Sequence, residues 1–247
     1  MLLSQEFERQ GNWLFRRRSF LPLLGAPALA LVFHRYSYPW GSHTLDTILE
    51  MLGLGISMVG LSIRVYVAGN TPKKTSGRNT AKGQLAHSLN TSGMYSITRH
   101  PLYLGNFLVA LGPVMVFHTL WFIFVYVSFF WLYYERIIFA EEEFLRTKFG
   151  DAYLEWSDRT PAFVPNFKNW RPPGLPFSCR TALKREYHTL FLIVTLFTAI
   201  EVIGDVVVNG RFVIDPVWLI VFTFTLLFYV VVRTIRKKTK ILHVQGR

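Results

Sequence analysis

Long apolar segments alternate along the chain with short polar segments that are rich in lysine and arginine. Each apolar run is predicted to be a membrane helix, because about 20 apolar residues in a helix can cross a bilayer. Six runs are expected to form spans: Phe20 to Phe33, Leu45 to Ala68, Leu102 to Phe117, Leu120 to Ile138, Leu190 to Val208, and Phe212 to Val232. The first is short and contains Pro22 and Pro27, which favours an interfacial or tilted segment over a cleaved signal peptide. The pattern predicts an all-α, polytopic integral membrane protein with about six transmembrane helices.

The distribution of basic residues predicts the orientation of these spans. Residues 69–99 contain five basic residues and no acidic one: Lys73, Lys74, Arg78, Lys82 and Arg99. Residues 233–247 contain six basic residues and no acidic one, whereas the connections on the other side contain only Arg35 and Arg211. Because basic loops remain in the cytoplasm, both termini and both long loops are expected on the cytoplasmic side.

Composition narrows the class of protein further. Half of the residues are hydrophobic (51%), yet 27 Lys and Arg oppose 15 Asp and Glu, for a net charge of +12. The basic residues fall between apolar runs, which favours an anionic bilayer over nucleic acid as the partner. The single cysteine, Cys179, excludes an internal disulfide, and four histidines near span ends show no metal-ligand spacing (His34, His43, His118 and His188), so no metal site is expected. We expect N-terminal membrane helices in residues 1–70, a central core in residues 71–170, and two additional helices in residues 171–247.

Two groups of polar residues flank the third and fourth spans. The first contains Gly93-Met94-Tyr95 and Arg99-His100-Pro101-Leu102-Tyr103-Leu104-Gly105, and the second contains Glu141-Glu142, Phe149-Gly150 and Tyr153. Only His118-Thr119 separates the two spans, so a tight antiparallel hairpin is expected to bring both groups to one membrane face. Pro101 suits the first turn of a helix, and the amides of Leu102 and Tyr103 then favour a carboxylate or phosphate. The two glutamates favour an ammonium group, so the site is predicted to hold a zwitterion.

The spacing of these residues resembles a known family of membrane methyltransferases, which includes isoprenylcysteine carboxyl methyltransferase and the phospholipid methyltransferases. The resemblance covers about residues 80–165 and rests on Tyr95, Arg99-His100-Pro101, Tyr103, Gly105, Glu141-Glu142, Leu145, Phe149-Gly150, Tyr153, Pro161 and Pro165. It implies an all-helical enzyme with an isoprenylcysteine-methyltransferase-like core that binds S-adenosylmethionine in a cytosolic pocket and methylates a lipid.

By similarity, most of the cofactor-binding residues lie in the same two groups. They are His87, Leu89, Asn90, Tyr95, His100, Pro101, Leu102, Tyr103, Glu141 and Glu142, with Gln84 as a further candidate. Glu141 would bind the amino group of the cofactor. Arg99 and His100 are the catalytic candidates, together with Arg136, which stands near the place of an arginine that meets the substrate carboxylate in prenylcysteine enzymes.

The acceptor is predicted to be a membrane lipid with a phosphate-bearing head group, because the basic loop before Tyr95 suits one. Three alternatives stay open. The first is a prenylcysteine carboxyl methyltransferase, the second an NADPH-dependent membrane reductase related to the sterol reductases, and the third a noncatalytic membrane scaffold. The oligomeric state is open as well.

Some polar and small residues inside the spans have a structural interpretation. Gly53, Gly55 and Gly60 are expected to allow close packing of helices, and Arg64 is expected to snorkel to the interface. Glu201 and Asp205 stand four residues apart on one face of the fifth span, which indicates a structural pairing, an oligomer contact or a contact with substrate. The fifth and sixth spans themselves have no role that the sequence reveals.

Overall fold

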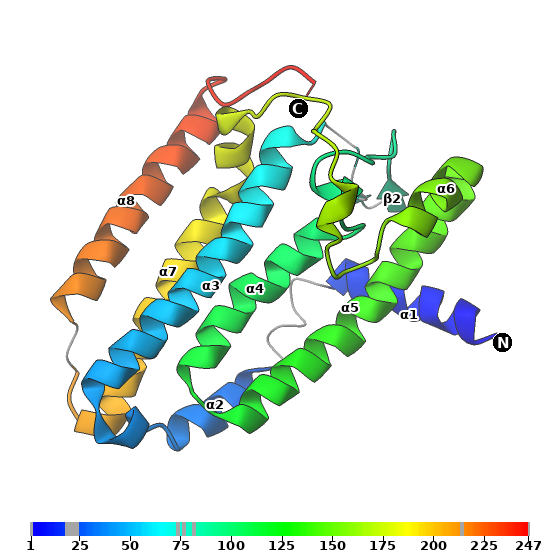
Figure 1. Ribbon diagram of the computed structural model, residues 1–247. Helices are drawn as coiled ribbons and strands as arrows, with labels where there is room; N and C mark the ends of the chain where they lie inside the picture. Colours follow the sequence, from blue (N-terminus) through cyan, green and yellow to red (C-terminus); the bar gives the residue numbers. More distant parts are fainter. Residues whose placement is uncertain are drawn as a thin grey trace.

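Helices form nearly all of the secondary structure (Figure 1). The computed structural model describes residues 2–17, 25–72, 75, 78–80, 83–212 and 215–246, and only the backbone of residues 78–80 and 83–85. The helices are α1 (Leu3–Arg17), α2 (Ala26–His34), α3 (His43–Asn70), α4 (Pro101–Val116), α5 (Leu120–Phe149), α6 (Asp151–Arg159), α7 (Cys179–Asn209) and α8 (Pro216–Lys238). Single 3-10 turns are η2 (Pro39–Gly41), η3 (Met94–Ser96) and η4 (Phe167–Asn169). The all-α prediction is confirmed apart from a small antiparallel hairpin of β1 (Arg78–Thr80) and β2 (Gly83–Leu85) in the basic loop.

The prediction of six membrane spans is confirmed in part. Within the described residues, α3, α5, α7 and α8 are long and apolar enough to cross a membrane, and α4 is apolar but has only 16 residues. In the described residues the first predicted run appears only as α2, which has 9 residues and so rises only about 14 Å, in agreement with the expected short interfacial or tilted segment. Residues 20–24 of that span lie outside the described residues.

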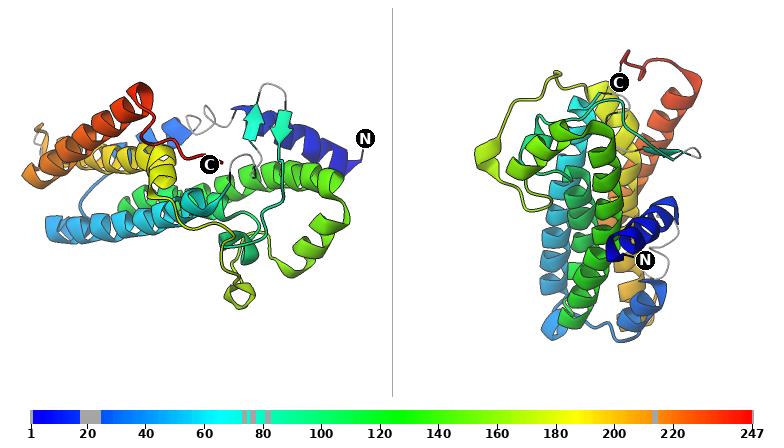
Figure 2. Two further views of the ribbon diagram at one scale, coloured as in Figure 1. Left: turned by 90° about the horizontal axis from the view of Figure 1, so that it is seen from above. Right: turned by 90° about the vertical axis from the view of Figure 1, so that its right-hand side faces the viewer.

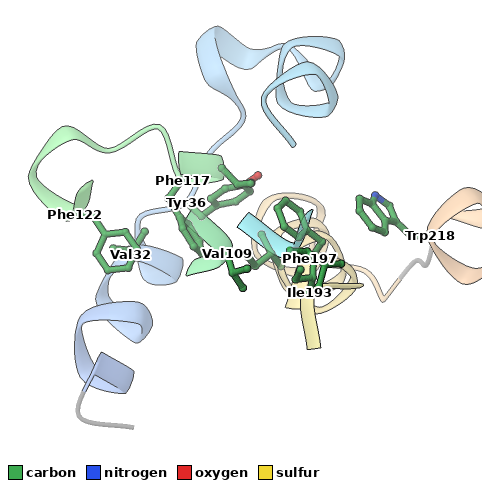
Figure 3. Close-up of a cluster of buried hydrophobic side chains, with 11 residues drawn as sticks. Val32, Tyr36, Val109, Phe117, Phe122, Ile193, Phe197 and Trp218 are labelled. Atoms are coloured by element: carbon green, nitrogen blue, oxygen red, sulfur yellow. The ribbon is translucent and has the colours of Figure 1, made fainter. Parts of the chain in front are cut away.

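The five long helices lie side by side in the order α8, α7, α3, α4 and α5 (Figures 1 and 2). Helix α1 lies against α5, and α2 lies against α7. Buried side chains from α2, α3, α4, α5, α7 and α8 meet in one apolar cluster, which includes Phe117, Phe122, Ile193, Phe197 and Trp218 (Figure 3). The turn between α4 and α5 contains only Phe117, His118 and Thr119, so the predicted tight hairpin is confirmed.

Glycines bring α3 and α4 into backbone contact. A Cβ atom at Gly53 would lie 2.6 Å from the carbonyl oxygen of Gly112, and one at Gly60 would lie 2.7 Å from that of Gly105. Gly55, by contrast, faces open space. Close packing is therefore confirmed for Gly53 and Gly60 and is wrong for Gly55. This contact positions the start of α4 beside the end of α3, where the two groups of polar residues meet.

The substitution Gly60→Ala is expected to destabilise the protein by about 1–2 kcal/mol, because the added methyl group forces two backbones apart. The matched substitution Gly55→Ala should leave stability unchanged or raise it slightly, since alanine is the better helix former and nothing obstructs it. Unfolding of both variants in detergent micelles, followed by tryptophan fluorescence, measures the difference. Equal stability of the two variants would contradict the close contact.

Candidate functional site

A cavity of about 590 Å³ lies at one end of the helix row, and its volume is in the range of roughly 300–1,000 Å³ that is typical of small-molecule sites. It is bounded by the end of α3, the start of α4, the second half of α5, the start of α7 and the end of α8. The described lining residues include Phe15, Arg64, Leu89, Asn90, Tyr95, Arg99, His100, Pro101, Leu102, Tyr103, Asn106, Tyr134, Glu141, Leu145, Lys184, Arg185, Glu186 and Arg236. Both groups of polar residues flanking the hairpin therefore contribute to one cavity.

Direct contacts join the start of α4 to the acidic pair on α5. The hydroxyl of Tyr103 donates a hydrogen bond of 2.6 Å to Glu141 Oε2. His100 Nε2 lies 2.9 Å from Glu142 Oε1, and Arg99 Nε lies 2.9 Å from the same oxygen. The predicted proximity of the two groups is thus confirmed. The Glu141 carboxylate lines the cavity, whereas Glu142 is not among the described lining residues and instead holds Arg99 and His100 in place.

The segment before α4 is held by the loop that follows α6. The amides of Arg99 and His100 donate to the carbonyl oxygens of Pro161 and Ala162 at 2.9 and 3.2 Å. In return, the amide of Asn166 donates to the carbonyl oxygen of Ile97 at 2.9 Å. The proline-containing loop at residues 161–166 therefore fixes the entry into α4. This contact gives a structural reason why Pro161 and Pro165 belong to the pattern of residues on which the resemblance rests.

Aromatic side chains shape the cavity near Glu141. The rings of His100 and Tyr103 stack with their centroids 5.4 Å apart and an interplanar angle of 10°. Burial, and then the negative charge of Glu141, raise the pKa of the Tyr95 hydroxyl above its ordinary value. Tyr95 therefore remains a neutral phenol at neutral pH. Its backbone is held by Trp156, whose indole nitrogen donates to the carbonyl oxygen of Tyr95 at 3.0 Å.

The predicted anion-binding role of the first amides of α4 needs a correction. The amide of Tyr103 already donates to the carbonyl oxygen of His100 at 3.0 Å, so it is engaged within the helix turn. Pro101 occupies the first helical position, as predicted, and Leu102 lines the cavity. A role of the Leu102 amide in binding an anion stays a prediction.

Of the loop residues that were predicted by similarity to bind the cofactor, only some line the described cavity. Leu89 and Asn90 line the cavity, and the Asn90 side chain accepts a hydrogen bond of 3.3 Å from the amide of Ser92. His87 is exposed and is not among the described lining residues. Gln84 lies in β2, where only the backbone is described. The side chains of Lys73, Lys74, Arg78 and Lys82 also lie outside the described part of the chain.

Arg136 faces α1 rather than the described part of the cavity. Its Nε donates to Gln10 Oε1 at 2.8 Å, and its guanidinium carbon lies 4.9 Å from the centroid of the Phe7 ring. Gly11 lies against the same turn of α5, at Arg136 and Ala140. The structure therefore separates Arg136 from Arg99 and His100 and gives it a role in holding α1. The amphipathic pattern of α1 was not interpreted in the sequence analysis, which left this partner unrecognised.

Cavity residues from α7 and α8 were missed by the sequence reasoning. Lys184, Arg185 and Glu186 come from the first turns of α7, and Arg236 comes from the end of α8. Arg64 does not simply snorkel, because its Nε and Nη2 donate to the two carboxylate oxygens of Glu186 at 2.8 and 3.1 Å. The available signal was the basic pair Lys184-Arg185 before the fifth apolar run and the basic tail after the sixth.

A comparison with protein families matches the part of the chain that contains the hairpin of α4 and α5. Residues 49–152, from within α3 to the start of α6, match the family model described as phospholipid methyltransferase. Over this stretch, which is less than half of the chain, the protein is similar to the phospholipid methyltransferases. The phospholipid methyltransferase match includes the hairpin, Arg99, His100 and both glutamates, whereas α7 and α8 lie outside it.

The curated proteins that this chain resembles include metal-resistance proteins and methyltransferases. Over 138 residues, 56% of each chain, the protein is 36% identical to the cobalt-zinc-cadmium resistance protein CzcN of Cupriavidus metallidurans. It is 26% identical over 144 residues to the protein-S-isoprenylcysteine O-methyltransferase of Schizosaccharomyces pombe, covering 58% of this chain and 61% of that protein. It is 31% identical over 133 residues to the nickel-cobalt-cadmium resistance protein NccN of Alcaligenes xylosoxydans xylosoxydans, covering 53% and 55%. The chain spans little more than half the length of these relatives. No solved structure matches it significantly.

Proposed function

We propose that the protein transfers a methyl group from S-adenosylmethionine to a membrane lipid with a phosphate-bearing head group. The observation that carries this proposal is the cavity itself, in which the Glu141 carboxylate faces a space that basic residues of α7 and α8 also line. An ammonium-binding group and an anion-binding wall are thus combined at the end of a membrane helix bundle. The match of residues 49–152 to the phospholipid methyltransferase model supports the methyltransferase class, and the acceptor is inferred from the charges of the cavity.

The residues of the cavity fit the cofactor. Glu141, whose position is fixed by the Tyr103 hydroxyl, would bind the amino group. The ring faces of Tyr95 and Tyr103 suit the positively charged sulfonium or the adenine. When bound, S-adenosylmethionine supplies an already activated methyl group. The protein then has to position the acceptor in line with it and exclude water.

The charges of the cavity favour an anionic acceptor. The described lining residues include five cationic side chains, Arg64, Arg99, Lys184, Arg185 and Arg236, and only two carboxylates, Glu141 and Glu186. A bound S-adenosylmethionine, with two positive groups and one negative group, would add to this excess of positive charge. A phosphate group on the acceptor would balance it. Cationic lining residues come from each of the three parts of the chain that the sequence distinguished: residues 1–70, 71–170 and 171–247. We therefore regard the three parts as one catalytic unit.

We further propose that the cavity faces the cytoplasm, as the positive-inside rule predicts. The cavity end of the helix row includes the basic end of α8, with Arg236, Lys237 and Lys238. Anionic lipids and S-adenosylmethionine are both available on that side.

Labelled S-adenosylmethionine added to membranes with and without the protein tests the function. Label in an anionic or zwitterionic phospholipid, identified by mass spectrometry, is the expected result. Label in protein instead would favour the prenylcysteine reaction named for the Schizosaccharomyces pombe relative, since a carboxylate acceptor also fits a cationic wall. Substrate reduction with NADPH and no response to S-adenosylmethionine would favour a reductase. Cofactor binding without transfer to any lipid would overturn the proposed acceptor.

The substitution Arg236→Gln is expected to raise the KM for the lipid acceptor by about 3- to 10-fold, because one charge-assisted contact to the head group is lost. The Kd for S-adenosylmethionine should stay within about twofold, since Arg236 is on α8 and Glu141 is on α5, the two helices at opposite ends of the row. Arg233→Gln is the matched control, because Arg233 is on the same helix but contacts Tyr229 and is not among the described lining residues. An equal effect of both substitutions would show that net charge, rather than the cavity wall, determines acceptor binding.

A further inference from the structure

Four buried carboxyl groups gather at the end of the helix row opposite the cavity. Asp46 and Glu50 belong to the first turns of α3, and Glu201 and Asp205 belong to the last turns of α7. The four residues are only 1%, 1%, 6% and 8% exposed, respectively. The spacing of four residues places each pair on one face of its helix, and α3 and α7 pack against each other (Figure 1). His43 stands one turn before Asp46 on the same face.

The side chains are close enough to share a small ligand. One oxygen from each of Asp46, Glu50 and Glu201 lies within 4.8 Å of the other two. Ligand atoms of His43, Glu201 and Asp205 fulfil the same condition, so Glu201 belongs to both sets. Two helices thus supply one imidazole and four carboxyl groups to one continuous cluster.

The charge of this cluster is not balanced by basic side chains. No ion pair with Lys or Arg involves any of the four carboxyl groups among the residues that the structure describes. Glu50 Oε1 is fully buried and has no hydrogen-bond partner. A buried carboxylate in that condition is unfavourable unless a proton or a cation accompanies it.

Other side chains hold the aspartates from outside the cluster. The hydroxyl of Tyr36 donates to Asp46 Oδ1 at 2.7 Å, and the hydroxyl of Tyr38 donates to Asp205 Oδ1 at 2.5 Å. Asn209 Nδ2 donates to the Tyr38 hydroxyl at 2.9 Å. Hydrogen bonds of this kind orient the ligands of protein metal sites.

We propose that His43, Asp46, Glu50, Glu201 and Asp205 bind a divalent transition-metal ion. The combination of an imidazole with carboxylates selects this class, since calcium and magnesium take oxygen ligands alone. The unpartnered Glu50 oxygen and the shared Glu201 lie where the two ligand sets meet, which makes them the central ligands. His43 is exposed, so the ion can enter from the aqueous side. The ion would clamp the start of α3 to the end of α7, independently of the methyl-transfer reaction.

The experiment uses the full chain, purified in detergent, with its affinity tag removed and treated with EDTA. Co²⁺ is the probe, because its visible absorption reports the ligands directly. Equilibrium dialysis with metal analysis is expected to give about one tightly bound Co²⁺ per chain and a rise in unfolding temperature when the ion is added. Glu50→Gln and Glu201→Gln should each weaken Co²⁺ binding by about 10- to 100-fold and remove the stabilisation.

Control variants test whether the loss of Co²⁺ binding is specific to the carboxyl cluster. Glu155→Gln, an exposed acid on α6, should bind Co²⁺ as the wild type does. If a glutamine variant fails to fold, His43→Ala replaces an exposed ligand and should weaken binding and change the visible absorption. Wild-type protein that binds no more Co²⁺ than Glu50→Gln would overturn the proposal. So would a wild-type protein whose unfolding temperature does not change when Co²⁺ is added, because that result describes carboxyl groups that share protons.

Discussion

The substitution Glu141→Gln is expected to weaken S-adenosylmethionine binding by about 10- to 100-fold. In the cavity, Glu141 Oε2 accepts the hydrogen bond from the Tyr103 hydroxyl at 2.6 Å, which leaves the rest of the carboxylate to meet the ammonium group of the cofactor. Glutamine keeps the volume and one acceptor but removes the negative charge. A hydrogen bond between charged groups contributes about 1.5–3 kcal/mol, which corresponds to this loss of affinity.

Isothermal titration of S-adenosylmethionine into the purified protein measures the effect. Glu143→Gln is the matched control, because Glu143 lies on the same helix but pairs with Arg146 at 2.6 Å on the exposed side. That variant should bind the cofactor as the wild type does. Tyr103→Phe should fall between the two, since it frees the Glu141 carboxylate without removing its charge. Unchanged affinity in Glu141→Gln would reject the assignment of the ammonium site, whatever the identity of the acceptor.

The hairpin explains why one half of the site was predictable from sequence. A connection as short as the three residues from Phe117 to Thr119 leaves two apolar helices no arrangement other than antiparallel neighbours. Residues just before the first helix and just after the second must then meet, as His100 and Glu142 do at 2.9 Å. The contacts in this half of the site therefore follow from the spacing of residues along the chain and from the antiparallel packing of the hairpin.

The other half of the site depends on which helices pack together over long separations in sequence. Nothing in the spacing of apolar residues indicates that α7 lies against α3, so the approach of Glu186 to Arg64 was not foreseen. For the same reason Glu201 could be recognised as an unusual membrane acid, but its neighbours Asp46 and Glu50 could not be assigned to it. The partner of Arg136 was missed because α1 is too polar to register as a span.

The ion pair of Arg64 and Glu186 is a structural support of the cavity wall. Glu186 is only 6% exposed and also accepts a hydrogen bond of 2.9 Å from Thr189. Arg64 additionally donates to the Asn106 side chain, and Asn106 donates to the Tyr134 hydroxyl at 3.0 Å. The pair therefore connects α3, α4, α5 and α7 beneath the cavity. Removing one partner leaves a charge in a desolvated place.

The substitution Glu186→Ala is therefore expected to destabilise the protein by about 3 kcal/mol, near the lower end of the range for broken buried pairs because Arg64 is partly exposed. The double substitution Arg64→Met and Glu186→Leu should recover most of that loss, since neither charge then remains. A double-mutant cycle on unfolding in detergent measures the coupling. The exposed pair of Glu143 and Arg146 is the matched reference, and Glu143→Ala should cost less than about 1 kcal/mol. Simple additivity at Arg64 and Glu186 would mean that the two side chains act separately, and other contacts between α7 and α3, such as the hydrogen bond from Arg185 to the Ala68 carbonyl oxygen at 3.3 Å, would then hold the helices together.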